Sequence, residues 1–221
     1  WEFTEKETKK CKDLLKNFDG ISVREDSGVL LCKENFDLKA EHVLDPTFLL
    51  DQNEYVNMIS KEDLINSSKT LMAYVLDTSD QKIAYLKQIS NELNVTFVHI
   101  DLETPFTIER RKNLNDYILP SISKWLSEFY KADYIITDSF HGTAFSIIFN
   151  KKFISIGNKK RGISRFTSIL NLFDLSERLV YSFEEITSKK LKNSIDYNKV
   201  NSLLSKHKRF SIDYLKKFLN K

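Results

Sequence analysis

Residues 134–148 read Y-I-I-T-D-S-F-H-G-T-A-F-S-I-I, which is a strand-like run followed at once by a helix-like one. The first part, 134–137, is mostly apolar, as expected for a strand that is buried on both faces. The second part, 141–149, has the length and the apolar spacing of a short helix. Because a polar loop carrying Asp138 separates the two, the stretch predicts a strand–loop–helix unit of an α/β fold.

The same alternation extends outward from this unit in both directions. Apolar, strand-like runs recur at a spacing that leaves room for one helix between neighbours, which indicates βαβ units and a parallel sheet. We therefore predict an α/β fold in which a Rossmann-like domain begins at about residue 67. The strands expected are 71–76, 95–100, 134–137 and 153–156, and the helices expected are 80–93, one marked by Ile122, Trp125, Leu126 and Phe129, 141–149 and 163–173.

The segment before this domain is shorter and more polar. It predicts a helix over 4–18, with Thr4 and Glu7 forming a capping box, and then a strand, a helix and a second strand within residues 21–44. Two strands and two helices are too few for a core of their own, so we expect residues 1–66 to be the remnant of a larger α/β domain plus a connector. Residues 67–221 would then form the C-terminal domain, ending in helices over 198–220. The chain starts at Trp1, and we expect it to be the C-terminal part of a longer protein.

Composition narrows the class of protein. A hydrophobic content of 41% and a charged content of 29% are typical of a globular protein, and a net charge of +3 is too small to predict nucleic-acid binding. The longest apolar runs are shorter than the roughly 20 residues that span a bilayer. The two cysteines, Cys11 and Cys32, have no metal-ligand spacing, and the four histidines are scattered. We expect no metal site and a cytoplasmic location, with peripheral contact to the inner face of a membrane as an option for the basic terminal helices.

The loops after the strands are where a ligand is expected, because open parallel sheets bind ligands beyond the carboxyl ends of their strands. Gly142, Gly157 and Gly162 fall in two such loops, and the amino end of helix 141–149 favours an anion. His141 at that helix end is the candidate general acid or base. The helix dipole would lower its pKa, whereas Asp138 could hold the ring and raise it; the sequence leaves both open.

The charge pattern also predicts an anion site. No Asp or Glu occurs from Ser139 to Phe173, where the chain's average of 31 acidic residues in 221 would place about five. The basic residues of this stretch would form a cradle for phosphate or carboxylate, although a solvated basic rim would give the same pattern. They are Lys151, Lys152, Lys159, Lys160, Arg161 and Arg165.

These motifs resemble those of the polysaccharide pyruvyl transferase family. The resemblance is carried by T137-D-S-F-H-G-T-A-F-S-I-I-F149 and N158-K-K-R-G-I-S-R-F-T-S-I-L170, and by the upstream segments S22-V-R-E-D-S-G28 and L44-D-P-T-F-L-L50. Together they cover most of residues 20–181 in the order that the family has. The resemblance implies two Rossmann-like domains facing each other across a cleft, as in GT-B glycosyltransferases. Residues 1–66 would then be the end of the first Rossmann-like domain plus the connector, and residues 67–221 would be the second domain.

The resemblance also implies an activity, namely transfer of pyruvate from phosphoenolpyruvate to a sugar of a bacterial surface polysaccharide as a ketal, with release of phosphate. The partners would be phosphoenolpyruvate and a glycan or lipid-linked acceptor used in exopolysaccharide biosynthesis, and no cofactor is implied. His141 would be catalytic. The residues expected to bind the anionic donor are Ser139, Gly142, Lys159, Lys160, Arg161, Arg165 and Arg24.

One position departs from the family's pattern. Many members have Arg-Leu-His-Gly where this chain has Ser139-Phe140-His141-Gly142, so Arg161 or Arg165 would have to supply the missing charge. The Asp-Ser-Phe-His-Gly form is similar to a recurrent subgroup of the family.

Two residues of the first segment, Arg24 and Asp45, end predicted strands. Arg24 can face the cleft or form a surface ion pair with Glu25 or Asp26. We expect Asp45 to accept backbone N–H bonds in the turn that contains Pro46.

Two other functions remain open at the level of the sequence. A GT-B-type glycosyltransferase would need an acidic residue for the ribose of a nucleotide-sugar, for which Asp77 or Asp101 could serve. A non-catalytic glycan-binding domain would explain why Ser139 stands in the place of an arginine. Preference for uridine diphosphate over phosphoenolpyruvate would favour the first, and glycan binding without turnover the second.

Overall fold

The structure is a computed structural model that describes residues 3–65, 68–100, 120–157 and 162–219. Contacts group the chain into two compact units, each assembled from separate stretches of sequence. The first unit comprises residues 1–50, 159–176 and 196–221, and the second comprises 51–158 and 177–195. The predicted domain boundary at residue 66 stays a prediction.

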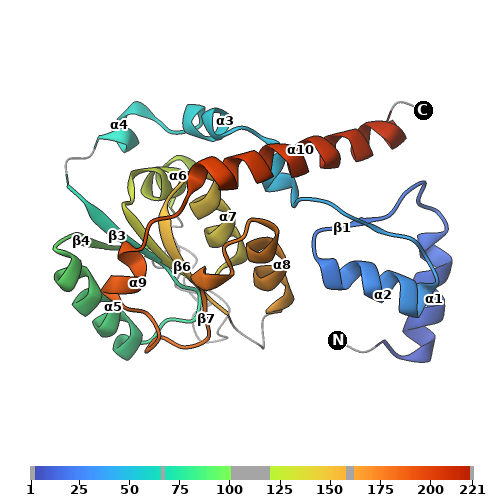
Figure 1. The fold of residues 1–221 in the computed structure, drawn as a ribbon, viewed down its shortest axis with the longest axis horizontal. Helices are drawn as coiled ribbons and strands as arrows, with labels where there is room; N and C mark the ends of the chain where they lie inside the picture. Colours follow the sequence, from blue (N-terminus) through green and yellow to red (C-terminus); the bar gives the residue numbers. More distant parts are fainter. Residues whose placement is uncertain (1–2, 66–67, 101–119, 158–161, 220–221) are drawn as a thin grey trace, which may run out of the picture. The chain divides into compact units, whose positions relative to one another are not determined.

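The second unit contains a parallel five-stranded sheet with the order β4-β3-β5-β6-β7 (Figure 1). This is the doubly wound order in which the chain starts near the middle, adds one strand on one side and then continues on the other. The predicted Rossmann-like, parallel α/β fold is confirmed. Its strands are β3 (Thr70–Tyr74), β4 (Thr96–His99), β5 (Tyr134–Thr137), β6 (Lys152–Ile156) and β7 (Leu179–Val180).

Helices cover both faces of this sheet, as Figure 1 shows. Side chains of β3 alternate between the faces, so that Leu71 and Ala73 join a core with α5 and α9. Tyr74 lies on the other face, where its ring contacts Trp125 and Phe129 of α6. The helices of this unit are α3 (Gln52–Asn57), α4 (Lys61–Leu64), α5 (Asp80–Leu93), α6 (Ile122–Lys131), α7 (Phe140–Ile148) and α9 (Ser188–Lys192).

The first unit is built around a short parallel pair, in which Ser22 lies opposite Glu41 and Val23 opposite His42. The predicted capping box at Thr4 is confirmed, and it begins the first helix. A small apolar cluster that includes Cys32 and Phe36 packs beside the pair. The elements of this unit are α1 (Glu5–Leu15), β1 (Ser22–Val23), α2 (Asp26–Phe36), β2 (Glu41–His42), the 3-10 helix η1 (Pro46–Leu49), α8 (Ser164–Leu172) and α10 (Tyr197–Leu219); a further 3-10 turn, η5, spans Ser176–Arg178.

No helix in the described part of the chain is both long enough and apolar enough to cross a membrane.

Candidate functional site

The loop between β5 and α7 places His141 at the carboxyl edge of the five-stranded sheet. β3 lies between β4 and β5, so the direction in which the chain adds strands reverses between β3 and β5. Ligands of open α/β sheets bind at such a reversal, because the loops there diverge and leave a crevice. His141 is exposed, whereas Gly142 and every later residue of α7 are buried. The histidine is therefore the residue that α7 presents to solvent at this edge.

Asp138 ties the ends of the two strands together. It is buried, and its Oδ1 accepts the N–H of Leu76 at 2.6 Å while its Oδ2 accepts that of Asp77 at 3.0 Å. Hydrogen bonds to the ionised form satisfy a carboxylate that burial would otherwise disfavour. Both of its oxygens thus fix the loop after β3, which is a role that the sequence did not suggest.

Ser139 caps α7. Its hydroxyl accepts the N–H of Gly142 at 3.4 Å, and its own N–H bonds to the Thr137 hydroxyl at 3.0 Å. In this arrangement the Ser139 oxygen acts as an acceptor, so its proton can still be donated to an anion. Ser139 is only 7% exposed, so a ligand can contact it only where the loop between β5 and α7 is open to solvent.

Gly142 is required by packing. A Cβ atom at this position would lie 2.2 Å from Thr137 Oγ1 and 3.0 Å from Tyr74 Cδ1. The backbone of Gly142 has no positive φ, so the conformational freedom of glycine is not what selects it. Its role is to bring the first turn of α7 close to the ends of β3 and β5, as in other strand–helix junctions that carry a ligand loop.

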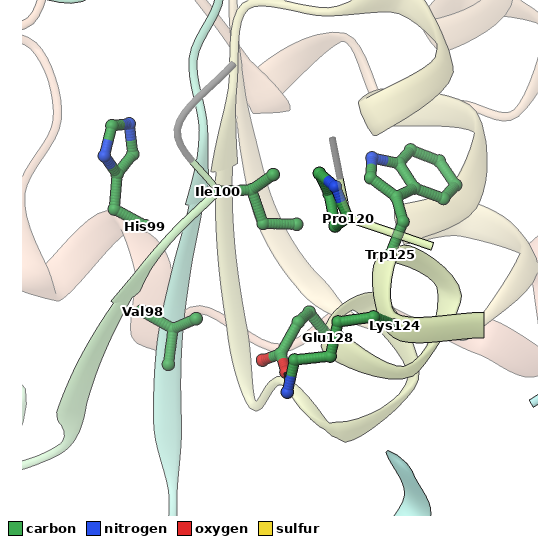
Figure 2. A pocket seen from close by; sticks show the side chains of 7 residues that line it. All are labelled: Val98, His99, Ile100, Pro120, Lys124, Trp125 and Glu128. Carbon is green, nitrogen blue, oxygen red and sulfur yellow. Dashed lines mark ion pairs between the residues drawn. The ribbon is translucent and has the colours of Figure 1, made fainter. Parts of the chain in front are cut away.

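Beside this edge lies a pocket of about 460 Å³, shown in Figure 2. Trp125 and Ile100 line it, together with an ion pair of 2.7 Å between Lys124 and Glu128. The Trp125 ring also contacts Tyr74, whose pKa is raised by burial; the Trp125 hydrogen bond opposes this, and the Asp138 charge adds to it. The other residues that line the pocket are Val98, His99 and Pro120.

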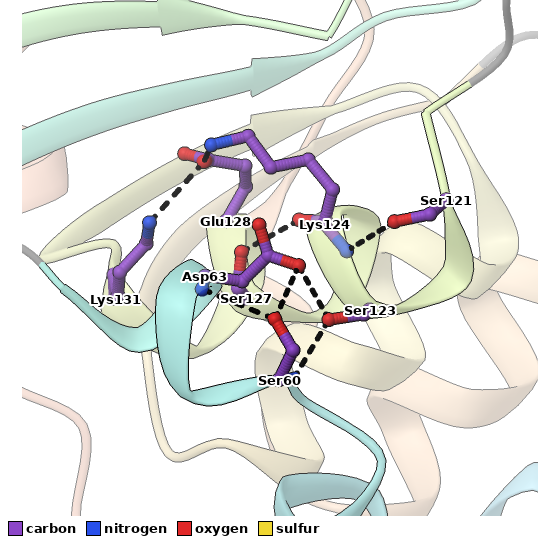
Figure 3. Close-up of polar contacts among 8 residues, drawn as sticks. All are labelled: Ser60, Asp63, Ser121, Ser123, Lys124, Ser127, Glu128 and Lys131. Carbon is purple, nitrogen blue, oxygen red and sulfur yellow. Dashed lines mark hydrogen bonds and ion pairs between the residues drawn. The ribbon is translucent and has the colours of Figure 1, made fainter.

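The helix that carries Trp125 is anchored by a polar network, shown in Figure 3. Ser123 donates to Asp63 at 2.5 Å and accepts the N–H of Ser60 at 2.8 Å, which attaches α4 to the first turn of α6. Glu128 pairs with both Lys124 and Lys131 on α6 itself. These contacts fix α6, and with it the wall of the pocket.

The basic residues after residue 150 do not all lie at one place. Lys152 begins β6 and lies opposite Tyr134 at the beginning of β5, so it belongs to the amino edge of the sheet, away from His141. Lys151 is tied to the Tyr130 carbonyl at 2.5 Å, and burial lowers its pKa. The prediction that these two lysines help to form the anion cradle is therefore wrong. Lys151 precedes β6 and Lys152 is its first residue, whereas ligand loops follow strands. Lys159, Lys160 and Arg161 lie outside the described residues, as does Asp101.

The remaining predicted donor-binding residues belong to the first unit. Arg165 lies in the first turn of α8, after Gly162, whose φ of +79° is one that glycine tolerates. Arg24 follows β1 directly, and its Nη1 lies 2.5 Å from Asp45 Oδ2. The predicted turn at Asp45 is confirmed, since its Oδ1 accepts the N–H of Thr47 at 3.0 Å. The ion pair between Arg24 and Asp45 was not predicted.

Arg24 and Arg165 lie on stretches that contact each other within this unit. Ser164 donates to Glu25 Oε2 at 2.5 Å, and the N–H of Asp26 donates to the Ser168 hydroxyl at 3.0 Å. The residues just after Arg24 are thus attached to the helix that carries Arg165. Within the described ranges, no three His, Cys, Asp or Glu side chains are placed to hold a metal ion.

Comparison with known proteins adds the identity of the chain's family. A family model described as polysaccharide pyruvyl transferase matches residues 1–160, which is well over half of the sequence. The chain belongs to the polysaccharide pyruvyl transferase family. The matched range includes Arg24, Asp45 and the whole of the β5–α7 loop with His141. The family is named for a transferase activity.

Other comparisons are weaker. No curated protein matches the chain. Among solved structures, the crystal structure of the glycotransferase of kitacinnamycin matches with a TM-score of 0.46 and 10% sequence identity. The match covers 68% of this chain and 43% of the other, so this family member spans less than half of that protein's length.

Proposed function

We propose that this member of the family transfers pyruvate from phosphoenolpyruvate to a sugar of a bacterial surface polysaccharide as a cyclic ketal. The observation that carries the proposal is the exposed His141 at the switch point of the sheet, in a chain whose family is polysaccharide pyruvyl transferase. The buried bonds of Asp138 and Ser139 support a fixed position for this histidine, as proton transfer requires.

The proposed reaction is balanced by proton transfers alone. A proton added to the methylene carbon of phosphoenolpyruvate makes it a methyl group and leaves an oxocarbenium-like C2. One sugar hydroxyl adds to C2 and gives up its proton. The C2–O bond to phosphate then breaks, the second hydroxyl adds and loses its proton, and phosphate leaves with a proton. His141 is the group that we assign to these transfers, and no cofactor is part of the proposal.

The donor carries a phosphate and a carboxylate, and both need cationic or N–H partners. In the second unit we assign this role to the amino end of α7 with Ser139 and Gly142. For Arg24, Arg165 and the basic run Lys159, Lys160 and Arg161, we propose the same role from membership of the family. The dipole of α7 favours an anion at its first turn, and no acidic residue lies between Ser139 and Phe173 to oppose it. An arginine pair attached through Glu25 and Ser164 suits a ligand with two anionic groups.

The test uses phosphoenolpyruvate labelled with ¹³C at its methylene carbon, together with polysaccharide from the source cells as acceptor. We expect the labelled carbon to appear as a ketal methyl signal by NMR, with equal release of phosphate. His141→Gln should lower the rate by about 10²- to 10⁴-fold, the usual contribution of a general acid or base, while phosphoenolpyruvate still binds. His207→Gln is the matched control, because it changes a histidine of α10 to which no role in the reaction is assigned.

Two results would contradict the proposal. One is turnover that survives unchanged in the His141→Gln variant, which would remove the assigned acid–base group. The other is calorimetric binding of uridine diphosphate with no binding of phosphoenolpyruvate, which would indicate glycosyl transfer instead.

A further inference from the structure

Arg24 and Asp45 leave the same edge of the parallel pair in the first unit. Arg24 comes directly after β1, and Asp45 comes three residues after the last residue of β2. The N–H of Val43 donates to the Val23 carbonyl at 2.9 Å, so the register of the pair continues up to the point where both segments turn away. The edge is the carboxyl one, where ligands of parallel sheets bind.

Asp45 is a buried carboxylate held from two sides. It is 5% exposed, and its Oδ1 accepts both the N–H of Thr47 at 3.0 Å and the Thr47 hydroxyl at 2.6 Å. Its Oδ2 contacts Nη1 of Arg24 at 2.5 Å. The side chain of Arg24 is 36% exposed, so the guanidinium lies partly in solvent while its partner does not.

Asp45 is charged at neutral pH despite its burial. Burial raises its pKa, but the hydrogen bonds from Thr47 and Arg24 and the charge of Arg24 together outweigh this and hold the pKa below its usual value. A cap for η1 does not need this charge, since serine or asparagine also accepts the N–H of a helix start. The charge of Asp45 therefore acts on the side chain that it contacts, Arg24.

The backbone after Arg24 is fixed as well. Glu25 accepts the Ser164 hydroxyl, and the N–H of Asp26 donates to Ser168, so residues 25 and 26 are attached to α8. The side chain of Arg24 is thus held by Asp45, and the chain that follows it is held by α8. An arginine side chain that is already held in place loses less conformational freedom on binding an anion than one that is free to move.

We propose that Asp45 is a positioning residue that orients the Arg24 guanidinium for the carboxylate or phosphate of the donor. Thr47 extends the arrangement, because it fixes the oxygen of Asp45 that does not contact Arg24. This inference rests on the proposed function, in which Arg24 binds phosphoenolpyruvate.

The test is a double-mutant cycle measured by phosphoenolpyruvate binding to the whole chain. Asp45→Asn keeps an acceptor for Thr47 but removes the negative charge that contacts Arg24. We expect this variant to bind phosphoenolpyruvate about 10-fold more weakly, as for a lost charged contact. In an Arg24→Ala background the same change should have no further effect, because the residue that it positions is gone. Loss that is equal in both backgrounds would indicate a merely structural role and overturn the inference.

Ser211→Ala is the matched control, because Ser211 is buried in the same unit and accepts the N–H of Leu44, next to Asp45. It should lower stability without changing the binding of phosphoenolpyruvate. If Asp45→Asn does not fold, the Thr47→Val variant tests the inference instead. Weaker binding of phosphoenolpyruvate with a native circular dichroism spectrum supports the inference, and unchanged binding of phosphoenolpyruvate overturns it.

The two proposals fail in different ways. Wild-type protein that binds uridine diphosphate but no phosphoenolpyruvate contradicts the proposed function, and the inference with it. Wild-type protein that binds phosphoenolpyruvate as tightly as its Asp45→Asn variant contradicts the inference alone.

Discussion

Replacing Gly142 by alanine tests whether the site depends on close packing between α7 and the strand ends. The added Cβ would lie 2.2 Å from Thr137 Oγ1 and 2.9 Å from Thr137 Cβ, which is closer than nonbonded atoms can approach. The Thr137 side chain cannot simply turn aside. Its hydroxyl donates to the Tyr74 carbonyl at 2.7 Å and accepts the N–H of Ser139 at 3.0 Å.

The size of the effect follows from these contacts. Loss of the two hydrogen bonds costs about 1 kcal/mol each, and forcing a methyl group into a packed interior costs about 1–3 kcal/mol. The higher helix propensity of alanine returns at most about 1 kcal/mol. We therefore expect Gly142→Ala to lower the free energy of unfolding of the second unit by about 2–4 kcal/mol.

The assay is urea unfolding followed by Trp125 fluorescence in a Trp1→Phe background. Trp125 suits this purpose because its ring packs on Tyr74 and, at 4.9 Å between centroids, on Phe145 of α7. Gly28→Ala, followed by circular dichroism, is the control for a helix-start glycine with more room. Its added Cβ would lie 3.1 Å from the nearest atom, on Val23, and the cost should stay within about 1 kcal/mol. Equal stability losses in the two variants would refute the packing argument.

Two further predictions concern buried or bonded charges. Arg178 is 2% exposed and donates to the carbonyls of Lys190, Asn193 and Ser194. Arg178→Ala removes the donor of these three hydrogen bonds and opens a cavity, so it should lower the unfolding free energy by about 3–5 kcal/mol in a urea titration. Arg178→Met, which refills the volume, should recover only part of this. A loss within about 1 kcal/mol for both variants would show that the cation is dispensable. Asp63 has a pKa held below its usual value, first by the Ser123 hydroxyl against the opposing effect of burial, and further by Ser60, Lys124 and Lys131. Because the folded pKa of Asp63 lies below the unfolded one, its stabilisation is complete above about pH 4 and is lost as the pH falls through the folded pKa. The unfolding free energy of Asp63→Asn should therefore change less with pH in the acid range than that of wild type. An identical pH dependence of the two proteins would contradict the role of the carboxylate.

Much of the fold follows from patterns that involve only neighbouring residues. The helix predicted over 80–93 is α5, Asp80–Leu93, and the strand predicted over 134–137 is β5, Tyr134–Thr137. α5 is long and periodic and has a polar start at Ser79, whereas β5 is a short apolar run bounded by polar residues. The position of His141 at the start of a helix after a strand was predicted for the same reason, because the strand, the loop and the helix are contiguous.

Two short elements of the second unit were not predicted from the sequence. β7 has only two residues, Leu179 and Val180, and becomes a strand by pairing with β6 at Ser155 and Ile156. Two residues carry no readable period, so only the partner strand decides their conformation. α9, Ser188–Lys192, was missed likewise, and it is short and rich in lysine.

The sequence alone determined the order of the longer helices and strands, the capping box at Thr4, and the motif that indicates the family, because each of these depends on residues close together in the chain. The tertiary structure decided which strand ends meet. Asp138 reaches Leu76 across a separation of 62 residues, and Arg24 reaches Asp45 across 21. Periodicity encodes which face of an element is buried, but it does not say which element will cover that face. The partners of Asp138, Gly142 and Arg24 are therefore set by strand order and register, which depend on how the whole core packs.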